Sequence, residues 1–345
     1  MERKKKNLDW ANLGFGYMKT NGNIRYYFKD GKWSEGQISE DENVSIHIAA
    51  TALHYGQECF EGLKVKEAKD GRVLCFRVDE NAKRMIKSAK KIYMEPPPQE
   101  LFIESIFKVV DHNWEFIPPY GYGASLYVRP ILLGLSPRIG VTPSTEYLYM
   151  VMVTPVGPYF KTGFKPIKLL VVEDVDRAAP LGVGDAKVGG NYAAGLRGTF
   201  IAKNKGYTEC LYLDAKEKKY IDESGPANFF AITKDGTYVT PRSTSILPSI
   251  TNMSLRQIAA DLGWKVEERP IHIDELETFE EVGCCGTAAV ITAVESIDYR
   301  GKRFVFIKDG KPGPKCTQLY EILSGIQTGD REDPYGWIKE IPITK

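Results

Sequence analysis

Lys187 is the residue of this sequence whose surroundings most suggest covalent chemistry. It lies between two pairs of glycines, in the run LGVGDAKVGGNY (181–192). Glycines let a backbone approach a bound group closely. A lysine amine there can form a Schiff base with a carbonyl cofactor, provided that its surroundings favour the neutral amine. Spacing alone also allows an ordinary solvated lysine, so both interpretations stay open at this point.

Glu223 is the second candidate and lies in the run IDESGPAN (221–228). An enzyme that uses pyridoxal phosphate needs an acid beside the pyridine nitrogen, because the protonated ring then acts as an electron sink. A glutamate at a tight turn can supply that acid. The alternative is an acid that only caps the turn.

Anion binding is the third candidate activity. The run LPSITN (247–252) precedes and opens a predicted helix, and the start of a helix offers free N–H groups and the positive end of the helix dipole to an anion. The turn Gly286-Thr287-Ala288 adds a hydroxyl, and Arg84 can add a bidentate charge. Taken singly, each of these features is also typical of simple caps and turns.

Several other chemistries are excluded by the motifs that are missing. The sequence has no G-x-G-x-x-G, P-loop, G-x-S-x-G or H-E-x-x-H run. Its four histidines are scattered, so no metal site is expected. Its six cysteines form no C-x-x-C pair, which argues against zinc and thioredoxin-like sites and favours a reducing, cytoplasmic environment.

Charge and hydropathy exclude further partners. The formal net charge is +1, with 46 basic and 45 acidic residues, so no charge excess favours nucleic acid or an anionic membrane. No stretch is apolar enough for a membrane helix. The basic N-terminus, MERKKKNLDW, is followed by no apolar run, so we interpret it as a solvated terminus and not as a signal peptide.

Length and patterning predict two mixed α/β domains. A chain of 345 residues corresponds to about two domains at roughly 150 residues each. Prolines and glycines interrupt the pattern in TPVGPYFKTGFKPIK (154–168), which is typical of an interdomain connection. We therefore expect an N-terminal domain at 1–156, a loop at 157–167 and a C-terminal domain at 168–345.

The predicted elements include both helices and strands. Asp79 is the expected N-cap of the first helix below. Helices are predicted at 79–93, 99–114, 192–204, 249–262 and 316–328, and strands at 73–77, 124–133, 147–153, 168–172, 209–213, 229–233, 265–269, 282–285 and 289–294.

Together these runs resemble the branched-chain amino acid aminotransferases, which are pyridoxal-phosphate enzymes of fold type IV. The resemblance covers residues 12 to 337 and rests on the runs LHYGQECFEGLK, NAKRMIKSAK, LYVRPILLG, VGPYF, DAKVGGNY, DESGPANFF, ILPSIT and GTAAVI. It implies a small N-terminal α/β domain, a larger C-terminal domain with a barrel-like core, and an active site between them. It also implies amino-group exchange between leucine, isoleucine or valine and 2-oxoglutarate, by a ping-pong mechanism.

The resemblance assigns roles to the cofactor-binding residues. Lys187 resembles the lysine that holds pyridoxal phosphate and shuttles the proton, Tyr192 the tyrosine on the phenolic oxygen, and Glu223 the partner of the ring nitrogen. The other matching positions are a residue on the ring face (Leu247), a second arginine near the cofactor (Arg177) and the phosphate-binding set Arg84, Ile250, Thr251 and Thr287.

The resemblance also assigns roles to the residues that bind the substrate. The walls of an apolar pocket match Tyr55, Phe60, Tyr127 and Tyr159, Arg129 matches the cation that accepts the side-chain carboxylate of glutamate, and the backbone at Thr287 and Ala288 is expected to hold the α-carboxylate. In the family the tyrosine that Tyr55 matches comes from the neighbouring subunit, so a homodimer is implied.

Two departures and two alternatives accompany the resemblance. Pro226 replaces the Thr or Gly of many members, and Ala289 and Thr292 occupy the redox C-x-x-C positions of some animal enzymes, so no thiol switch of that kind is expected. A D-amino acid aminotransferase or lyase of the same fold is disfavoured by Tyr127-Val128-Arg129. A binding protein without catalysis is disfavoured because Lys187 and its partners are all present.

Overall fold

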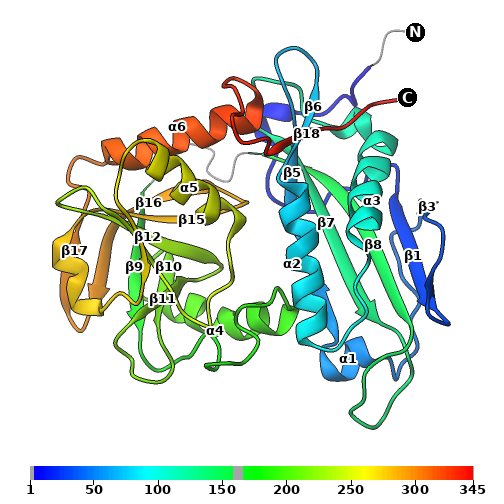
Figure 1. Cartoon of the computed structure of the whole chain (residues 1–345), viewed down its shortest axis with the longest axis horizontal. Helices are drawn as coiled ribbons and strands as arrows, with labels where there is room; N and C mark the ends of the chain where they lie inside the picture. The colour runs from blue at the N-terminus through cyan, green and yellow to red at the C-terminus, as the bar shows by residue number, and fades with distance from the viewer. Residues whose placement is uncertain (1–3, 158–165, 345) are drawn as a thin grey trace. The chain divides into compact units, whose positions relative to one another are not determined.

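Two nine-stranded sheets form the framework of the chain in a computed structural model, which describes residues 4–157 and 166–344 (Figure 1). The described residues group into two compact units. The first contains the N-terminal sheet and the second the C-terminal sheet. Each unit is built around its own buried apolar core, as expected for domains of this length.

The first sheet has the strand order β18-β6-β5-β7-β8-β1-β2, with β3 paired to β1 and β4 paired to β7. Its pairs are antiparallel, and the long central pair β7–β8 keeps one register from Ser125↔Val156 to Gly134↔Tyr147. The strands are β1 (Asn23–Lys29), β2 (Lys32–Trp33), β3 (Gln37–Ser39), β4 (Glu58–Phe60), β5 (Leu63–Glu67), β6 (Val73–Phe76), β7 (Ser125–Gly134), β8 (Tyr147–Val156) and β18 (Ile338–Glu340).

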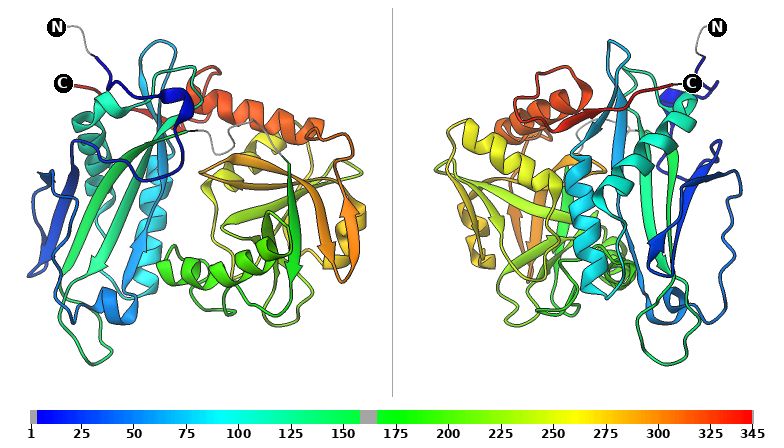
Figure 2. Two further views of the ribbon diagram at one scale, coloured as in Figure 1. Left: turned by 180° about the vertical axis from the view of Figure 1, so that it is seen from behind. Right: turned by 45° about the vertical axis from the view of Figure 1, so that its right-hand side comes forward.

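Helices α2 (Val78–Lys91) and α3 (Gln99–His112) lie side by side against this sheet (Figure 2). Alternate residues of β7 are buried, and the residues between them, among them Tyr127 and Arg129, are half-exposed. This alternation is typical of a sheet with one covered and one open face. A short helix, α1 (Thr51–Tyr55), and the 3₁₀ turns η1 (Trp10–Asn12) and η2 (Trp114–Phe116) complete the unit.

The second sheet closes on itself. Its order is β11-β10-β9-β16-β15-β12-β13-β14, and β11 also pairs with β12, which makes a closed six-stranded barrel. The barrel is filled by apolar side chains such as Leu169, Phe229 and Ile297. The strands are β9 (Ile167–Val172), β10 (Glu209–Leu213), β11 (Ile221–Ser224), β12 (Ala227–Thr233), β13 (Tyr238–Pro241), β14 (Val266–Arg269), β15 (Phe279–Gly286), β16 (Val290–Tyr299) and β17 (Lys302–Val305).

The helices that accompany the barrel strands are α4 (Gly189–Asn204), α5 (Ile250–Asp261), η3 (Ile273–Thr278) and α6 (Pro314–Thr328). The mixed α/β fold and the barrel-like core of the C-terminal part are as expected. Each helix and strand predicted from the sequence is present: the strand at 209–213 has the predicted bounds, and the others have one or both ends shifted. The helix at Asp79 begins differently, because its N-cap is Arg77 in the left-handed region and no side chain caps it. The predicted Asp79 cap is therefore wrong.

The two units differ from the expected domain boundaries at two places. Residues 186–189 and 325–345 group with the first unit. The C-terminal residues do so because β18 pairs antiparallel with β6, and the short segment does so because its backbone bonds to α2 and β4. Most of the proposed loop at 157–167 lies outside the described residues.

Candidate active site

The backbone of Lys187 is held on both sides by the first unit. Its N–H donates to Ser88 Oγ of α2 at 2.8 Å, and its carbonyl oxygen accepts from the Phe60 N–H of β4 at 3.0 Å. Lys187 Nζ lies 4.7 Å from the centroid of the Phe60 ring. The lysine that the sequence singles out is thus anchored by a helix and a strand, as a positioned reactive group requires.

Gly189 explains why glycine follows so soon after Lys187. Its N–H donates to a carboxylate oxygen of Glu58, and a Cβ built on Gly189 would lie 2.0 Å from Glu58 Oε1. A side chain at this position would require the Glu58 carboxylate, the end of a flexible side chain, to move away. Burial raises the pKa of Glu58, although the bond from Gly189 opposes this shift.

Arg84 lies on α2 and makes a bidentate pair with Glu61. Its Nε donates to Oε1 at 2.7 Å and its Nη2 to Oε2 at 2.8 Å. Glu61 is completely buried and also accepts from Asn81 Nδ2 at 2.7 Å. Burial acts to raise the pKa of Glu61, but attraction to Arg84, the bonds from Arg84 and attraction to Lys187 outweigh it and hold the pKa below its ordinary value. Sequence reasoning missed Glu61, although it directly follows Phe60.

Strand β7 places Tyr127 and Arg129 on the same half-exposed face. Arg129 Nη2 donates to the Tyr127 hydroxyl at 3.0 Å. The guanidinium carbon lies 4.8 Å from the ring centroid of Phe60 and 5.2 Å from that of Tyr127, within cation–π range. Phe60 therefore touches both Arg129 and Lys187, so the structure brings three predicted substrate residues together with the lysine.

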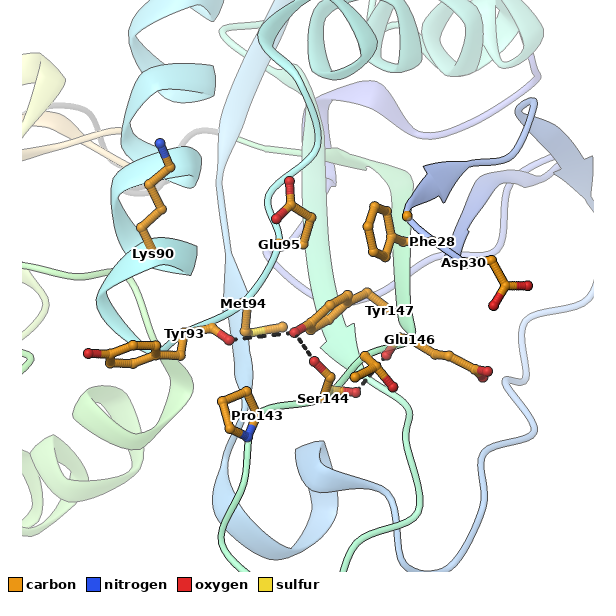
Figure 3. A pocket seen from close by; sticks show the side chains of 12 residues that line it. Phe28, Asp30, Lys90, Tyr93, Met94, Glu95, Pro143, Ser144, Glu146 and Tyr147 are labelled. Atoms are coloured by element: carbon orange, nitrogen blue, oxygen red, sulfur yellow. Dashed lines mark hydrogen bonds between the residues drawn. The ribbon is translucent and has the colours of Figure 1, made fainter.

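Two of the predicted substrate residues do not join this group. Tyr55 lies at the end of α1, is 37% exposed and donates to the carbonyl oxygen of Ile139. Tyr159 lies outside the described residues. A cavity of about 600 Å³ in the same unit is lined by residues such as Lys90 and Tyr147 and by none of the predicted site residues (Figure 3).

Glu223 lies at the centre of a second group, in the barrel unit. Its Oε2 accepts from Arg177 Nε at 2.5 Å, and its Oε1 accepts from the Leu247 N–H at 2.8 Å and from Asn228 Nδ2 at 2.9 Å. All four residues are buried. Donors from three separate segments therefore converge on one carboxylate, and the predicted residues Arg177 and Leu247 are two of its partners.

The start of α5 follows directly after Leu247. Ser249 is the N-cap, and its side chain accepts from the Asn252 N–H. Ile250 and Thr251 are the first two residues of the helix and are buried. The N–H groups of a first turn have no acceptor within their own helix, so this helix start offers donors of the kind that binds phosphate.

Tyr192 lies in the first turns of α4 and faces a cavity of about 250 Å³ together with Arg177 and Pro226. The remaining residues that line this cavity are Asn191, Gly195, Leu196, Thr199, Glu209 and Gly225. The structure thus brings two predicted cofactor residues, Tyr192 and Arg177, to one cavity of the barrel unit.

Thr287 and Ala288 are half-buried in the turn that joins β15 to β16. Cys284 and Cys285 precede this turn on β15 as buried free thiols. Burial raises the pKa of Cys284 to about 12 and holds the pKa of Cys285 well above its ordinary value. These thiols are therefore weak nucleophiles at neutral pH.

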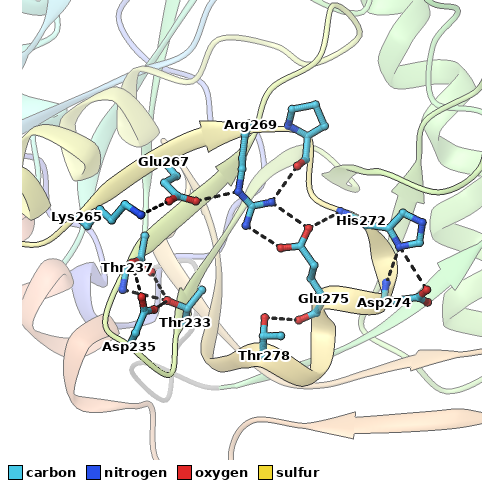
Figure 4. Close-up of polar contacts among 11 residues, drawn as sticks. Thr233, Asp235, Thr237, Lys265, Glu267, Arg269, His272, Asp274, Glu275 and Thr278 are labelled. Atoms are coloured by element: carbon cyan, nitrogen blue, oxygen red, sulfur yellow. Dashed lines mark hydrogen bonds and ion pairs between the residues drawn. The ribbon is translucent and has the colours of Figure 1, made fainter.

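Another polar cluster of the barrel unit serves its structure. Arg269 makes a bidentate pair with Glu275, whose carboxylate also accepts from the His272 N–H (Figure 4). The side chain of His272 in turn accepts from the Asp274 N–H. These bonds fix the start of η3 beside β14 and include no predicted site residue.

Each group, taken by itself, holds residues that suit a part of pyridoxal phosphate chemically. A buried acid suits a protonated ring nitrogen, a tyrosine hydroxyl suits the phenolic oxygen, and arginines with free helix N–H groups suit the phosphate. Among the described residues no cluster of three or more His, Cys, Asp or Glu is arranged to hold a metal ion. No helix in the described ranges is long and apolar enough to cross a membrane.

Known proteins of similar sequence include branched-chain-amino-acid aminotransferases. Residues 58–297 match the family model described as amino-transferase class IV. A branched-chain-amino-acid aminotransferase of Haemophilus influenzae is 47% identical over 342 residues, which cover 97% of this chain and 99% of that protein. A branched-chain-amino-acid aminotransferase of Helicobacter pylori is 45% identical and is covered to 98%, against 97% of this chain.

Solved structures of branched-chain amino acid aminotransferases are also similar to this chain. The Escherichia coli branched-chain amino acid aminotransferase aligns with a TM-score of 0.77 at 28% identity, over 93% of this chain and all of that one. The T.th. branched-chain amino acid aminotransferase with pyridoxamine 5'-phosphate aligns with a TM-score of 0.79 at 29% identity, over 94% of this chain and all of that one. The chain therefore belongs to the class IV aminotransferases, and within them to the branched-chain-amino-acid aminotransferases.

Proposed function

We propose that this aminotransferase uses pyridoxal phosphate to exchange amino groups between leucine, isoleucine or valine and 2-oxoglutarate, in two half-reactions of a ping-pong cycle. The observation that carries the proposal is the convergence of Arg177, the Leu247 N–H and Asn228 on Glu223, directly before the start of α5. When it is bound, pyridoxal phosphate supplies an electron sink for charge that develops on the substrate's α-carbon.

The chain's own residues then have separate tasks. Lys187 Nζ holds and returns the proton of the α-carbon, and its backbone bonds to Ser88 and Phe60 keep it in place while it does so. Glu223 accepts from the ring nitrogen, and Tyr192 donates toward the phenolic oxygen. Ile250 and Thr251 present backbone N–H groups to the phosphate, and Arg84 and Thr287 complete its binding.

The residues assigned to the substrate can accommodate both the apolar side chain of a branched-chain amino acid and the carboxylate side chain of glutamate. Phe60 and Tyr127 offer apolar surface, which favours a branched side chain by about 0.8 kcal/mol per buried CH₂. Arg129 lies against both rings and donates to the Tyr127 hydroxyl, so one cation is available for the second carboxylate of glutamate. The backbone at Thr287 and Ala288 is assigned to the α-carboxylate.

A homodimer is part of the proposal, with Tyr55 acting in the partner's site. The support is a group of exposed apolar side chains around α1. His54 of this helix bonds to the Ile48 carbonyl and Tyr55 bonds to the Ile139 carbonyl, while Ile48 is 83% and Ile139 79% exposed. Large exposed apolar side chains in a cluster favour contact with another protein surface. The free buried cysteines support a cytoplasmic location.

The experiment is an absorption spectrum of the purified protein with pyridoxal phosphate. Leucine alone is expected to convert the band of the bound cofactor, and 2-oxoglutarate is expected to restore it. A band that responds only to D-amino acids would favour the fold relatives, and a protein that binds no pyridoxal phosphate would refute the proposal.

Arg129→Met tests the substrate assignment. The KM for 2-oxoglutarate is expected to rise at least about tenfold, because the substrate's second carboxylate loses its cation, while the KM for leucine changes little. A parallel rise for both substrates would contradict the assignment. Lys69→Met, at an exposed lysine of the same unit, is the control for loss of one positive charge.

A further inference from the structure

A chain of buried side-chain amides leads away from Glu223. Asn228 Nδ2 donates to Glu223 Oε1 at 2.9 Å and to the Leu247 carbonyl oxygen at 3.1 Å. Asn228 Oδ1 accepts from Asn252 Nδ2 at 3.2 Å. The Tyr238 hydroxyl donates to Asn252 Oδ1 at 2.9 Å. All of these side chains are buried.

Glu223 fixes which way the side-chain amides in this series of hydrogen bonds are turned. A carboxylate and a carbonyl oxygen can only accept, so Asn228 must turn its NH₂ group toward Glu223 and Leu247. The Asn228 side-chain oxygen then faces Asn252, which must donate from its own NH₂ group. If Asn228 were reversed, its oxygen would lie against two acceptors, and buried polar groups without partners are costly.

Side chains of β13 fix the orientation of the Asn252 amide independently, at the end of the series that is farthest from Glu223. The Thr240 hydroxyl donates to the Phe229 carbonyl oxygen at 2.8 Å, so its oxygen accepts from Asn252 Nδ2, also at 2.8 Å. The Tyr238 hydroxyl supplies the donor for Asn252 Oδ1. Both partners therefore require the same orientation of the Asn252 amide.

We propose that Asn252 and Tyr238 are positioning residues, which fix the direction of the Asn228 amide and thereby the donor that Asn228 presents to Glu223. Asn252 is the third residue of α5, and its backbone N–H donates to the N-cap Ser249. The same residue thus joins the start of α5 to the hydrogen bonds of Glu223. The importance of this link for catalysis rests on the proposed function, in which α5 binds the phosphate and Glu223 the ring nitrogen.

Two substitutions of similar size separate direction from packing. Asn252→Asp keeps the shape but, when ionised, offers only acceptors and carries a negative charge, so it should force the Asn228 amide to turn its oxygen toward Glu223. Asn252→Leu removes the side-chain bonds without imposing a direction. Both keep the backbone bond to Ser249. Asn113→Asp is the matched control, since Asn113 is a fully buried amide of the first unit that bonds to the Gly22 and Val109 carbonyls.

The first measurement needs no cofactor. The infrared band of the protonated Glu223 carboxyl, assigned with Glu223→Gln, is followed against pH in the cofactor-free protein. We expect it to appear about one pH unit higher in Asn252→Asp, because Glu223 loses a donor and gains an opposing acceptor. Asn252→Leu should shift it less and Asn113→Asp not at all. Equal shifts in both Asn252 variants, or no shift in either, would overturn the proposal.

The second measurement is the dissociation constant for pyridoxal phosphate. It should rise at least about tenfold in Asn252→Asp, the equivalent of about one pH unit in the Glu223 equilibrium, and less in Asn252→Leu. Tyr238→Phe keeps the ring stacked on Phe230 and should give a smaller rise than either. If the unaltered protein bound no pyridoxal phosphate, the proposed function would fail, and the infrared shift would still decide the inference.

Discussion

The pair Arg84–Glu61 gives the sharpest test of how the first unit is stabilised. The perturbation is Glu61→Gln, which keeps the size of the side chain and removes its charge. The Arg84 side chain is 9% and the Glu61 side chain 0% exposed, so the substitution leaves a guanidinium nearly buried without its carboxylate. The bond that Asn81 Nδ2 donates to Glu61 at 2.7 Å can still be made to an amide oxygen.

The magnitude follows from the burial of the pair. Removing one partner of a buried ion pair costs about 3–5 kcal/mol. At roughly 2–4 °C for each kcal/mol in a unit of this size, the thermal midpoint should fall by about 6–20 °C. Glu61→Gln combined with Arg84→Met removes both charges and should recover much of this loss, because no buried charge is then left without its partner.

The assay is thermal unfolding of the cofactor-free protein across pH. The pKa of Glu61 lies below its ordinary value, since its attraction to Arg84 outweighs the effect of burial. The stability from this pair is therefore present above the unfolded pKa and disappears as the pH falls through the folded one. The midpoints of the unaltered protein and Glu61→Gln should converge in acid. A difference below about 1 kcal/mol at pH 7 would refute the reasoning, because it is the value of an exposed pair.

Three further predictions concern single residues. Gly189→Ala puts a Cβ 2.0 Å from Glu58 Oε1, so the Glu58 carboxylate should move away and lose the bond from the Gly189 N–H. Pyridoxal phosphate binding should then weaken by up to about tenfold in an absorbance titration, the cost of one hydrogen bond. Gly198→Ala puts a Cβ 2.2 Å from the Tyr212 hydroxyl oxygen and should cost about 1–3 kcal/mol in thermal unfolding; an unchanged midpoint would contradict it. Burial raises the pKa of Asp222 from 3.8 to about 6, against the effects of Ser243 and Arg177. An acid with a raised pKa destabilises the fold as the pH rises through that interval, so Asp222→Asn should be up to about 3 kcal/mol more stable at pH 7 and no more stable below pH 4, as measured by urea unfolding.

The elements of the fold were predictable where apolar periodicity is strong. The buried strand at Leu211 and the amphipathic helix around Met85 follow directly from their patterns. The start of that helix was not predictable, because it depends on a distant contact. Arg77 takes the left-handed conformation and its N–H donates to the Trp337 carbonyl oxygen at 2.7 Å, whereas local sequence favoured a cap at Asp79.

The candidate site was predictable through resemblance, and its role assignments stay predictions. What neither spacing nor resemblance revealed is the partner of each charge. Glu61 belongs to a run that matched for other residues, and Asn252 directly follows another such run. Nothing local shows that Glu61 is buried against Arg84 or that Asn252 supports Asn228. Such contacts join segments that are distant in sequence, so they follow from the tertiary fold alone.

Both arginines assigned to the cofactor are paired with a buried carboxylate, Arg84 with Glu61 and Arg177 with Glu223. A phosphate that binds Arg84 must therefore share this cation with Glu61. It follows that Glu61→Gln, while it destabilises the cofactor-free protein, should tighten the binding of pyridoxal phosphate and recover more stability from it than the unaltered protein does. Weaker binding in this variant would show that Glu61 orients Arg84 for the phosphate and does not compete with it.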